Sequence, residues 1–291
     1  MITPELLAQV RRLTIRSRRA VEEVFSGAYR SAFRGTGLEF AEVREYVPGD
    51  DIRAIDWNVT ARVGRPFIKR FDEERELTVI VAIDLSGSLA FGSRARTKRE
   101  AAAEAGALVA LAAARNRDRV GLLLFTDQIE LYLPPSKSRA RALRIVREML
   151  AFEPKGTGTD IPHALAFLGR VLRRRAILFV VSDWIGDDFE RGLAHLGRRH
   201  ELVSLEVSDP LEGTLPNSGL LWATDLETGR AGWIDLGSRK AQAEWRAAKS
   251  RRGRSLSDAF IRGRAGRIAI PTDASAAPAL IRHFEARARR H

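Results

Sequence analysis

The feature that most constrains this fold is a set of four continuous apolar runs, two of which end in an aspartate. The runs cover residues 77–84, 119–125, 176–183 and 201–207. Runs without polar alternation are typical of strands buried on both faces of a parallel sheet. Helix-like segments follow them at 97–115, 138–150, 161–174 and 189–199, and residues 129–133 are expected to add an edge strand. This alternation predicts an α/β fold with a doubly wound, mostly parallel sheet.

Shorter elements are predicted before the first buried run. The spacing of apolar residues favours a helix over residues 4–24. The following region is richer in glycine and polar residues, and a turn there contains Asp50 and Asp51. Either aspartate is expected to cap a short helix over residues 52–61, which a strand over residues 66–71 then follows.

The length of the chain favours more than one structural part. We predict an amino-terminal helix and small signature module at 1–76, the α/β domain at 77–210, and a hairpin with a basic helical extension at 211–291. The hairpin is expected over residues 219–236, and a strand over residues 267–270. Its Trp222 and Trp233 are interpreted as packing residues.

The composition excludes several classes of protein. Without cysteine, the chain has no disulfide, no thiolate zinc site and no cysteine nucleophile. No transmembrane run or signal peptide is expected, so a cytoplasmic location is predicted. The formal net charge is +12, and residues 239–267 hold ten Lys/Arg against two acidic residues. We interpret this segment as a solvated basic surface, with contact to nucleic acid, anionic lipid or an acidic protein as the alternative.

Three polar loops carry the residues with useful chemistry. They are D-L-S-G-S at 84–88, G-T-G-T-D at 156–160 and V-S-D-W at 181–184. The first and third follow buried strands, and the second opens a predicted helix. Ligands of open α/β sheets bind beyond the carboxyl ends of the strands, where the strand order reverses. The loops are therefore expected to meet in one site.

These loops offer an all-oxygen ligand set. The candidate ligands are Asp84, Ser86, Ser88, Thr159 and Asp183. Oxygen ligands suit a hard divalent cation, Mg²⁺ first, or Mn²⁺ or Ca²⁺. If the hydroxyls bind directly and the aspartates through water, the metal stays electrophilic and favours one added anionic ligand. The alternative interpretation is that these residues are ordinary turn and helix-cap residues.

D-L-S-G-S resembles the first element of the metal-ion-dependent adhesion site of von Willebrand factor A domains. The resemblance implies that Thr159 is the threonine of that site and Asp183 its distal aspartate. The chain departs from the family pattern because T-G-T stands in place of paired glycines, so Thr157 is a competing assignment. Trp184 also stands where a glycine is common.

The sequence G-T-G-L-E-F-A-E-V-R-E-Y-V-P-G-D-D-I-R-A-I-D-W-N-V-T-A-R, residues 35–62, closely resembles the signature of domain-of-unknown-function family 58. This bacterial and archaeal family joins the signature to a von Willebrand factor A-like domain. The resemblance implies a frequent association with MoxR-type AAA+ ATPases as chaperone-like partners. It supplies no established biochemical activity.

The signature is rich in opposite charges, among them Asp50, Asp51, Arg53 and Asp56. One interpretation is a buried ion-pair network that fixes the module, and the other is a docking surface. The structural interpretation is favoured because the neighbouring Trp57 suggests packing.

The function predicted from the sequence is metal-dependent protein binding, without catalysis. The chain is expected to be an adaptor or co-chaperone of a MoxR-type ATPase that binds a partner carboxylate through Mg²⁺. A metal-dependent phosphatase is the first alternative, with Asp84 as the nucleophile. Ser86 argues against it, because such enzymes need a second aspartate at that position. A basic nucleic-acid-binding protein is the second alternative, and it rests on charge alone.

Overall fold

In the computed structural model of the protein, the described residues are 28–29, 32–33, 39–72, 76–186, 188–213 and 219–289. The helix predicted over residues 4–24 lies outside them. The chain divides into two compact units, residues 33–77 and the remainder of the chain.

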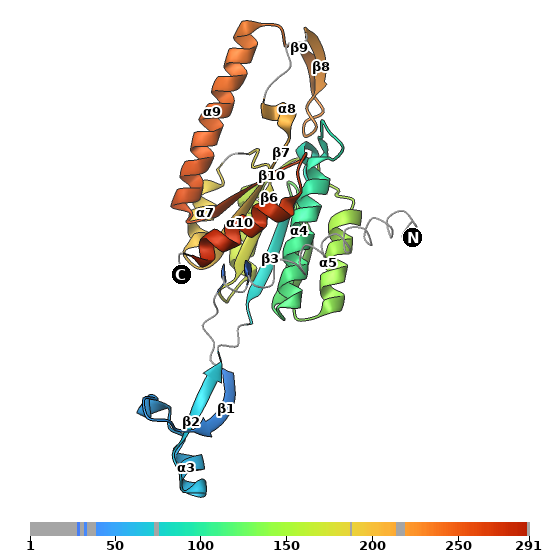
Figure 1. Ribbon diagram of the computed structural model, residues 1–291. Coiled ribbons are helices and arrows are strands. Elements are labelled where there is room, and N and C mark those ends of the chain that lie inside the picture. The colour runs from blue at the N-terminus through green and yellow to red at the C-terminus, as the bar shows by residue number, and fades with distance from the viewer. Residues whose placement is uncertain are drawn as a thin grey trace. The chain divides into compact units, whose positions relative to one another are not determined.

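The larger unit contains a six-stranded sheet in the order β10-β7-β6-β3-β4-β5. Four of these strands, β10, β7, β6 and β3, are labelled in Figure 1. The strands are β3 (Thr78–Asp84), β4 (Arg119–Phe125), β5 (Ile129–Ser136), β6 (Ile177–Ser182), β7 (Glu201–Ser208) and β10 (Gly266–Pro271). Every neighbouring pair is parallel except β4–β5. The predicted mostly parallel α/β fold is confirmed.

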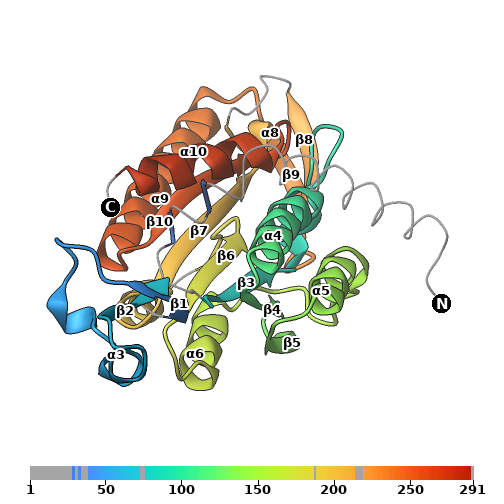
Figure 2. The same ribbon diagram turned by 60° about the horizontal axis from the view of Figure 1, so that its bottom comes forward.

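Helices cover both faces of this sheet. They are α4 (Lys98–Arg115), α5 (Arg139–Ala151), α6 (Ile161–Val171), α7 (Glu190–Gly197), α9 (Arg239–Arg262) and α10 (Ala276–Ala288). Figure 2 shows α4, α5 and α10 on one face and α6 on the other, where α7 and α9 also pack. Thr97, Ser138, Asp160, Ser238 and Ser275 cap the starts of α4, α5, α6, α9 and α10 with their side chains.

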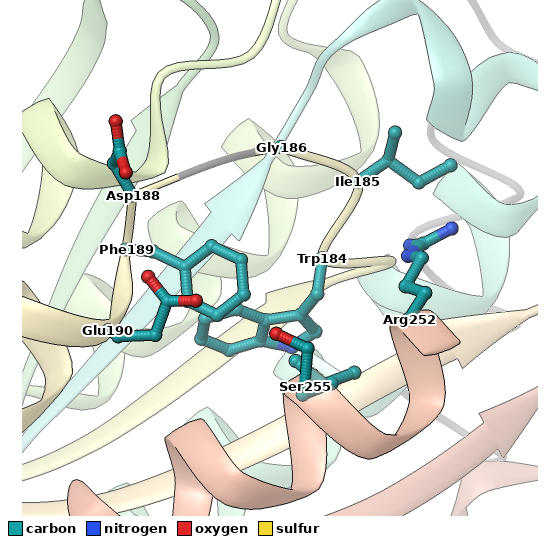
Figure 3. Close-up of a pocket in the computed structure, with 9 residues that line it drawn as sticks. Trp184, Ile185, Gly186, Asp188, Phe189, Glu190, Arg252 and Ser255 are labelled. Atoms are coloured by element: carbon teal, nitrogen blue, oxygen red, sulfur yellow. The ribbon is translucent and has the colours of Figure 1, made fainter. Parts of the chain in front are cut away.

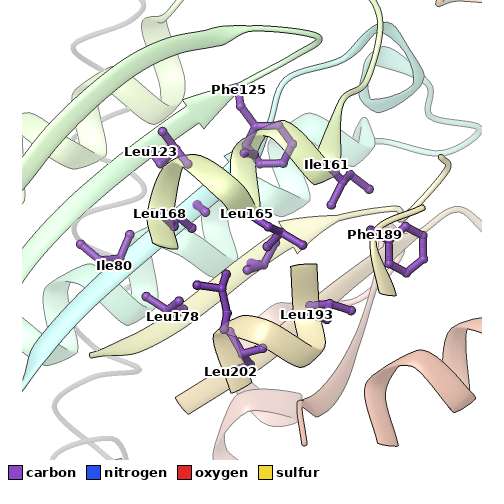
Figure 4. Close-up of a cluster of buried hydrophobic side chains, with 14 of the residues drawn as sticks. Ile80, Leu123, Phe125, Ile161, Leu165, Leu168, Leu178, Phe189, Leu193 and Leu202 are labelled. Carbon is purple, nitrogen blue, oxygen red and sulfur yellow. The ribbon is translucent and has the colours of Figure 1, made fainter. Parts of the chain in front are cut away.

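Two apolar layers hold these helices to the sheet. On one face, α4 is buried along most of its length, and its small side chains let it lie close to the strands. A β carbon at Gly106 of α4 would lie only 2.9 Å from the Ile83 side chain. On the other face, Leu165 and Leu168 of α6 pack against Leu123 and Leu178 of the strands (Figure 4). The strands are therefore buried from both sides, as their uninterrupted apolar character predicts.

The strand order reverses between β3 and β6. From β3 the chain continues to β4 and β5 on one side, and from β6 to β7 and β10 on the other. Because β3 and β6 are parallel neighbours, Asp84 at the end of β3 and Asp183 just after β6 lie at the same edge of the sheet. This edge is where α/β sheets bind ligands.

Residues after the predicted boundary at 210 contribute to the sheet, because β10 pairs with β7. Between them lie α8 (Pro210–Gly213) and a hairpin of β8 (Leu220–Thr224) and β9 (Ala231–Asp235). Trp222 and Trp233 form a cross-strand pair on this hairpin, with ring centroids 5.3 Å apart. Both rings stay more than half exposed, so they pack on each other and not in a core. Among the described residues, no helix has the length and apolar character needed to cross a membrane.

The smaller unit is a two-stranded sheet with two short helices. Its elements are β1 (Glu39–Glu45), the 3-10 helix η2 (Ile52–Ala54), α3 (Trp57–Val63) and β2 (Phe67–Asp72). The helix predicted over residues 52–61 is thus two pieces. The reason is local: Asp51 caps η2, while Asp56 has an extended backbone and caps α3 with its side chain.

The charges of the signature act locally. Asp50 accepts two hydrogen bonds from the Arg44 guanidinium, at 2.7 and 2.8 Å, and one from the Val47 amide. The Arg44 side chain is 37% exposed, so this pair is not buried. Trp57 is 68% exposed, so its side chain does not pack into a core of this unit. The described signature charges stabilise turns and helix starts, which short polar side chains do well.

Candidate metal centre

Asp84 ends β3 and is fully buried. One carboxylate oxygen accepts a hydrogen bond from the Ser86 amide at 2.8 Å, and the other from the Ser182 hydroxyl at 2.7 Å. Burial and, next, the charge of Asp183 raise the pKa of Asp84 to about 6, although these hydrogen bonds act in the other direction. Asp84 is therefore a buried carboxylate whose charge is not fully compensated.

Ser86 and Ser88 place two hydroxyl groups beside this carboxylate. Ser86 stands at the start of the 3-10 helix η3 (Gly87–Ala90), but its side chain makes no capping hydrogen bond. Its side chain is buried, and the two hydroxyl oxygens lie 3.2 Å apart. The alternative interpretation as a helix cap therefore does not explain Ser86.

The second loop is joined to the first by a backbone hydrogen bond from Gly87 to the Thr157 carbonyl at 2.8 Å. Thr159 precedes Asp160, which caps α6, so the Thr159 hydroxyl has no capping role either. That hydroxyl donates to the Glu227 carboxylate at 2.9 Å, whereas the exposed Thr157 donates to the Glu227 carbonyl at 3.3 Å. Both threonines thus contact the turn of the β8–β9 hairpin.

Asp183 is buried and paired with a lysine that the sequence did not single out. Lys98, at the start of α4, is 1% exposed, and its Nζ lies 2.6 Å from carboxylate oxygens of both Asp183 and Glu212. Burial lowers the pKa of Lys98, but the charges of Asp183 and Glu212 outweigh it and raise that pKa above its ordinary value. In the sequence, Lys98 belongs to a charged run at a helix start, which is usually solvated, and only the tertiary fold buries it.

The loop after Asp183 continues into a pocket of about 740 Å³ against α9. Trp184 has a φ of 59°, in the left-handed region that favours glycine, which gives a physical reason for the glycine that is common at this position. Its buried ring packs edge-on against Phe189 and Phe260. Figure 3 shows Arg252 reaching this loop from α9, where it donates to the Asp183 carbonyl at 2.6 Å.

The five predicted ligands thus come from three loops at one edge of the sheet, and hydrogen bonds connect Asp84, Ser86, Ser88 and the Thr157–Thr159 loop. Among the described residues, no three acidic or histidine side chains group closely enough to hold a metal by themselves. The hydroxyls are therefore essential to the metal hypothesis. The donor set fits a hard cation, because it is all oxygen and because hydrogen bonds compensate the charge of buried Asp84 only in part.

The strand order, the antiparallel edge strand and the polar loops at the reversal point define a von Willebrand factor A-like α/β domain. The chain belongs to the family described as "Protein of unknown function DUF58", whose model matches residues 42–255. The family resemblance of the signature is therefore confirmed.

Two curated relatives match most of the chain. "Uncharacterized protein Rv1480" of Mycobacterium tuberculosis and "Uncharacterized protein Mb1516" of Mycobacterium bovis are each 31% identical over 229 residues, or 78% of this chain and 72% of the relative. The "Magnesium-chelatase 60 kDa subunit" of Cereibacter sphaeroides is 39% identical over 155 residues, which is 53% of this chain but 26% of that protein.

Solved structures with a similar arrangement include BatB from Bacteroides thetaiotaomicron, at 17% identity and a TM-score of 0.49, covering 73% of this chain and 99% of that one. The SpRpn10 VWA domain is 11% identical with a TM-score of 0.41, covering 74% of this chain and 95% of that one.

Proposed function

We propose that this protein is a binding protein without catalytic activity, and that Mg²⁺ at the Asp84 loop joins it to a carboxylate of a protein partner. One observation carries the proposal. The hydroxyls of Ser86 and Ser88 lie side by side next to a buried, undercompensated aspartate, and Ser86 caps no helix. Hydroxyl and carboxylate oxygens in this arrangement are suited to a hard cation.

The residues that would hold the ion are Ser86, Ser88 and Thr159 through their hydroxyls, with Asp84 and Asp183 acting through water. When bound, Mg²⁺ supplies a strong electrostatic attraction for one further anionic oxygen. Lys98 matters here because its ammonium already neutralises much of the charge of Asp183. The protein then offsets little of the cation's charge, which favours a carboxylate from outside.

The proposed partner is a MoxR-type AAA+ ATPase, for which this chain would be an adaptor or co-chaperone. The support is the resemblance to family 58 and the likeness of half of the chain to a protein named as a subunit of magnesium chelatase, and therefore as part of an assembly. The exposed basic residues of α9 would hasten encounter with an acidic surface.

The test is binding between purified protein and the MoxR-type ATPase of the same organism, measured with Mg²⁺ and with EDTA. Replacing Ser86→Ala and Ser88→Ala together should abolish the Mg²⁺-dependent binding, and EDTA should have the same effect on the wild type. Ser136→Ala, on the edge strand β5 and paired with Val120 at the amino end of β4, lies away from the Asp84 loop, so it is the matched control and should bind normally. Binding at full affinity in EDTA and in the double variant would rule out the metal bridge.

A further inference from the structure

The turn of the β8–β9 hairpin is built to hold one glutamate in place. The Asp225 amide donates to the Arg230 carbonyl and the Gly229 amide to the Asp225 carbonyl, each at 2.8 Å. The Asp225 carboxylate in turn accepts from the amides of Glu227 and Thr228, at 2.9 and 3.2 Å. The backbone on both sides of the Glu227 side chain is thereby fixed, although the turn stands at the surface.

This turn lies directly on the loops of the candidate metal centre. A β carbon at Gly87 would lie 2.1 Å from the Leu226 carbonyl oxygen, so only glycine allows this approach. Thr157 and Thr159 add the two hydrogen bonds to Glu227 described above. Within the turn, Glu227 is partly buried, while Asp225, Leu226 and Thr228 are exposed. The turn therefore holds one carboxylate against Thr159, a predicted ligand of the candidate metal centre.

A glutamate in this position offers the anionic oxygen that a cation at the proposed centre would favour. Its carboxylate oxygen accepts a hydrogen bond from the Thr159 hydroxyl, which leaves the lone pairs of that hydroxyl for a cation. The carboxylate is an anionic oxygen ligand of the kind that a hard cation prefers. It also comes from the same chain, so its effective concentration at the centre is high.

We propose that Glu227 is the centre's own carboxylate ligand, and that the β8–β9 hairpin occupies the position that a partner's carboxylate would take. This inference rests on the proposed function, because it needs the cation. It implies that a partner binds the metal only after the hairpin turn has moved away from Gly87 and Thr159. The exposed Leu220, Trp222 and Trp233 lie on the segment that would move.

Mn²⁺ binding to the full chain, followed by electron paramagnetic resonance, tests the inference. Glu227→Ala should weaken Mn²⁺ binding by about tenfold or more, because the loss of a residue that only hydrogen-bonds a metal ligand already has an effect of that size. Added acetate should restore the affinity of Glu227→Ala, because it fits the space left by the side chain, and should change the wild type little. Glu227→Gln should bind as weakly as Glu227→Ala but resist rescue, since its amide fills that space. Glu244→Ala, at an exposed glutamate on α9, is the control and should bind like the wild type.

The outcomes separate this inference from the function on which it rests. Equal Mn²⁺ affinity in the wild type and Glu227→Ala, with no effect of acetate, would overturn the role of Glu227 and leave the metal centre standing. A wild type that binds no Mn²⁺ would overturn the metal centre and the role of Glu227 together. Weak binding in Glu227→Ala that acetate does not improve would also overturn the ligand role, because a purely structural residue behaves in that way.

Discussion

Two buried aspartates lie at the carboxyl ends of strands of the same sheet, yet their pKa values are shifted in opposite directions. Asp209, just after β7, accepts hydrogen bonds from the Ser93 amide and hydroxyl, the Thr272 hydroxyl and the Leu211 amide. Burial raises its pKa, but these donors outweigh burial and lower the pKa to about 2. Asp84 has fewer donors and a neighbouring carboxylate, and its pKa is raised to about 6.

The two aspartates differ in how far the fold stabilises their charge. The charge of Asp209 is satisfied by side chains that join β7 to the loop before α4 and to the end of β10. The charge of Asp84 is compensated less, because it has fewer donors and lies close to the charge of Asp183. A buried carboxylate in that condition is a candidate for ligand binding, and the adjacent hydroxyls favour a cation over a proton donor.

The largest effect on stability is expected from Lys98→Met, which would leave the carboxylates of Asp183 and Glu212 without the buried ammonium that pairs with them. In EDTA, the free energy of unfolding should fall by about 3–5 kcal/mol, the usual cost of removing one partner of a buried ion pair. Mg²⁺ should recover part of this loss. Denaturant unfolding measures both, with Arg44→Met at the partly exposed pair as the control that changes stability much less. A loss no larger than that of Arg44→Met would contradict the compensating role of Lys98.

Asp84→Asn should raise the stability of the metal-free protein at pH 7. The pKa of Asp84 is about 6 in the folded protein, against an ordinary value of 3.8, so its ionisation destabilises the fold progressively between about pH 4 and pH 6. Above pH 6 the full effect is about 3 kcal/mol. Urea unfolding in EDTA at several pH values should show this slope in the wild type and lose it in Asp84→Asn. Since asparagine also loses one acceptor oxygen, the slope is the decisive readout. A wild-type stability that does not fall between about pH 4 and pH 6 relative to Asp84→Asn would mean that the Asp84 charge is satisfied.

Asp209→Asn should change the free energy of unfolding in the opposite direction from Asp84→Asn. It removes a charge that several donors stabilise, so the free energy of unfolding should fall by roughly 1–3 kcal/mol at pH 7. Because the folded pKa of about 2 lies below 3.8, the contribution of Asp209 is present above about pH 4 and is lost as the pH falls toward 2. The same unfolding series measures it, and a stabilised Asp209→Asn would remove the contrast with Asp84.

The smallest effect is expected from Trp57→Ala in the signature unit. Since Trp57 is 68% exposed, the melting temperature should change little, with a difference in free energy within about 0.5 kcal/mol. Calorimetry measures this change. A loss of several kcal/mol would show that the ring is buried in the intact protein, and would restore the packing interpretation of the signature.

Elements set by local pattern could be predicted from the sequence. The buried strands and their helices follow from uninterrupted apolar runs and from caps such as Thr97 and Ser138, whose signals lie within a few residues. The D-L-S-G-S loop follows β3 for the same reason. The break between η2 and α3 could not be predicted, because either Asp51 or Asp56 can start a helix and only the folded backbone shows that both do.

Residues that act through distant contacts could not be predicted. Lys98 and Asp183 are 85 positions apart, and Thr159 and Glu227 are 68 apart, so neither pair has a local signal. The residues after 210 looked like an appendage because β10 is short and follows a long basic helix, and its pairing with β7 is purely tertiary. Gly87 is a sequence signal for the contact with the hairpin, since its lack of a side chain permits the hairpin to approach.

The central claim is that a divalent cation binds at the Asp84 loop. Anomalous scattering from crystals grown with Mn²⁺ locates such an ion without reference to any partner. We expect a peak roughly 2 Å from the hydroxyl oxygens of Ser86 and Ser88, absent in crystals of the Ser86→Ala, Ser88→Ala variant. Well-ordered wild-type crystals with no peak at these hydroxyls under saturating Mn²⁺ would contradict the claim.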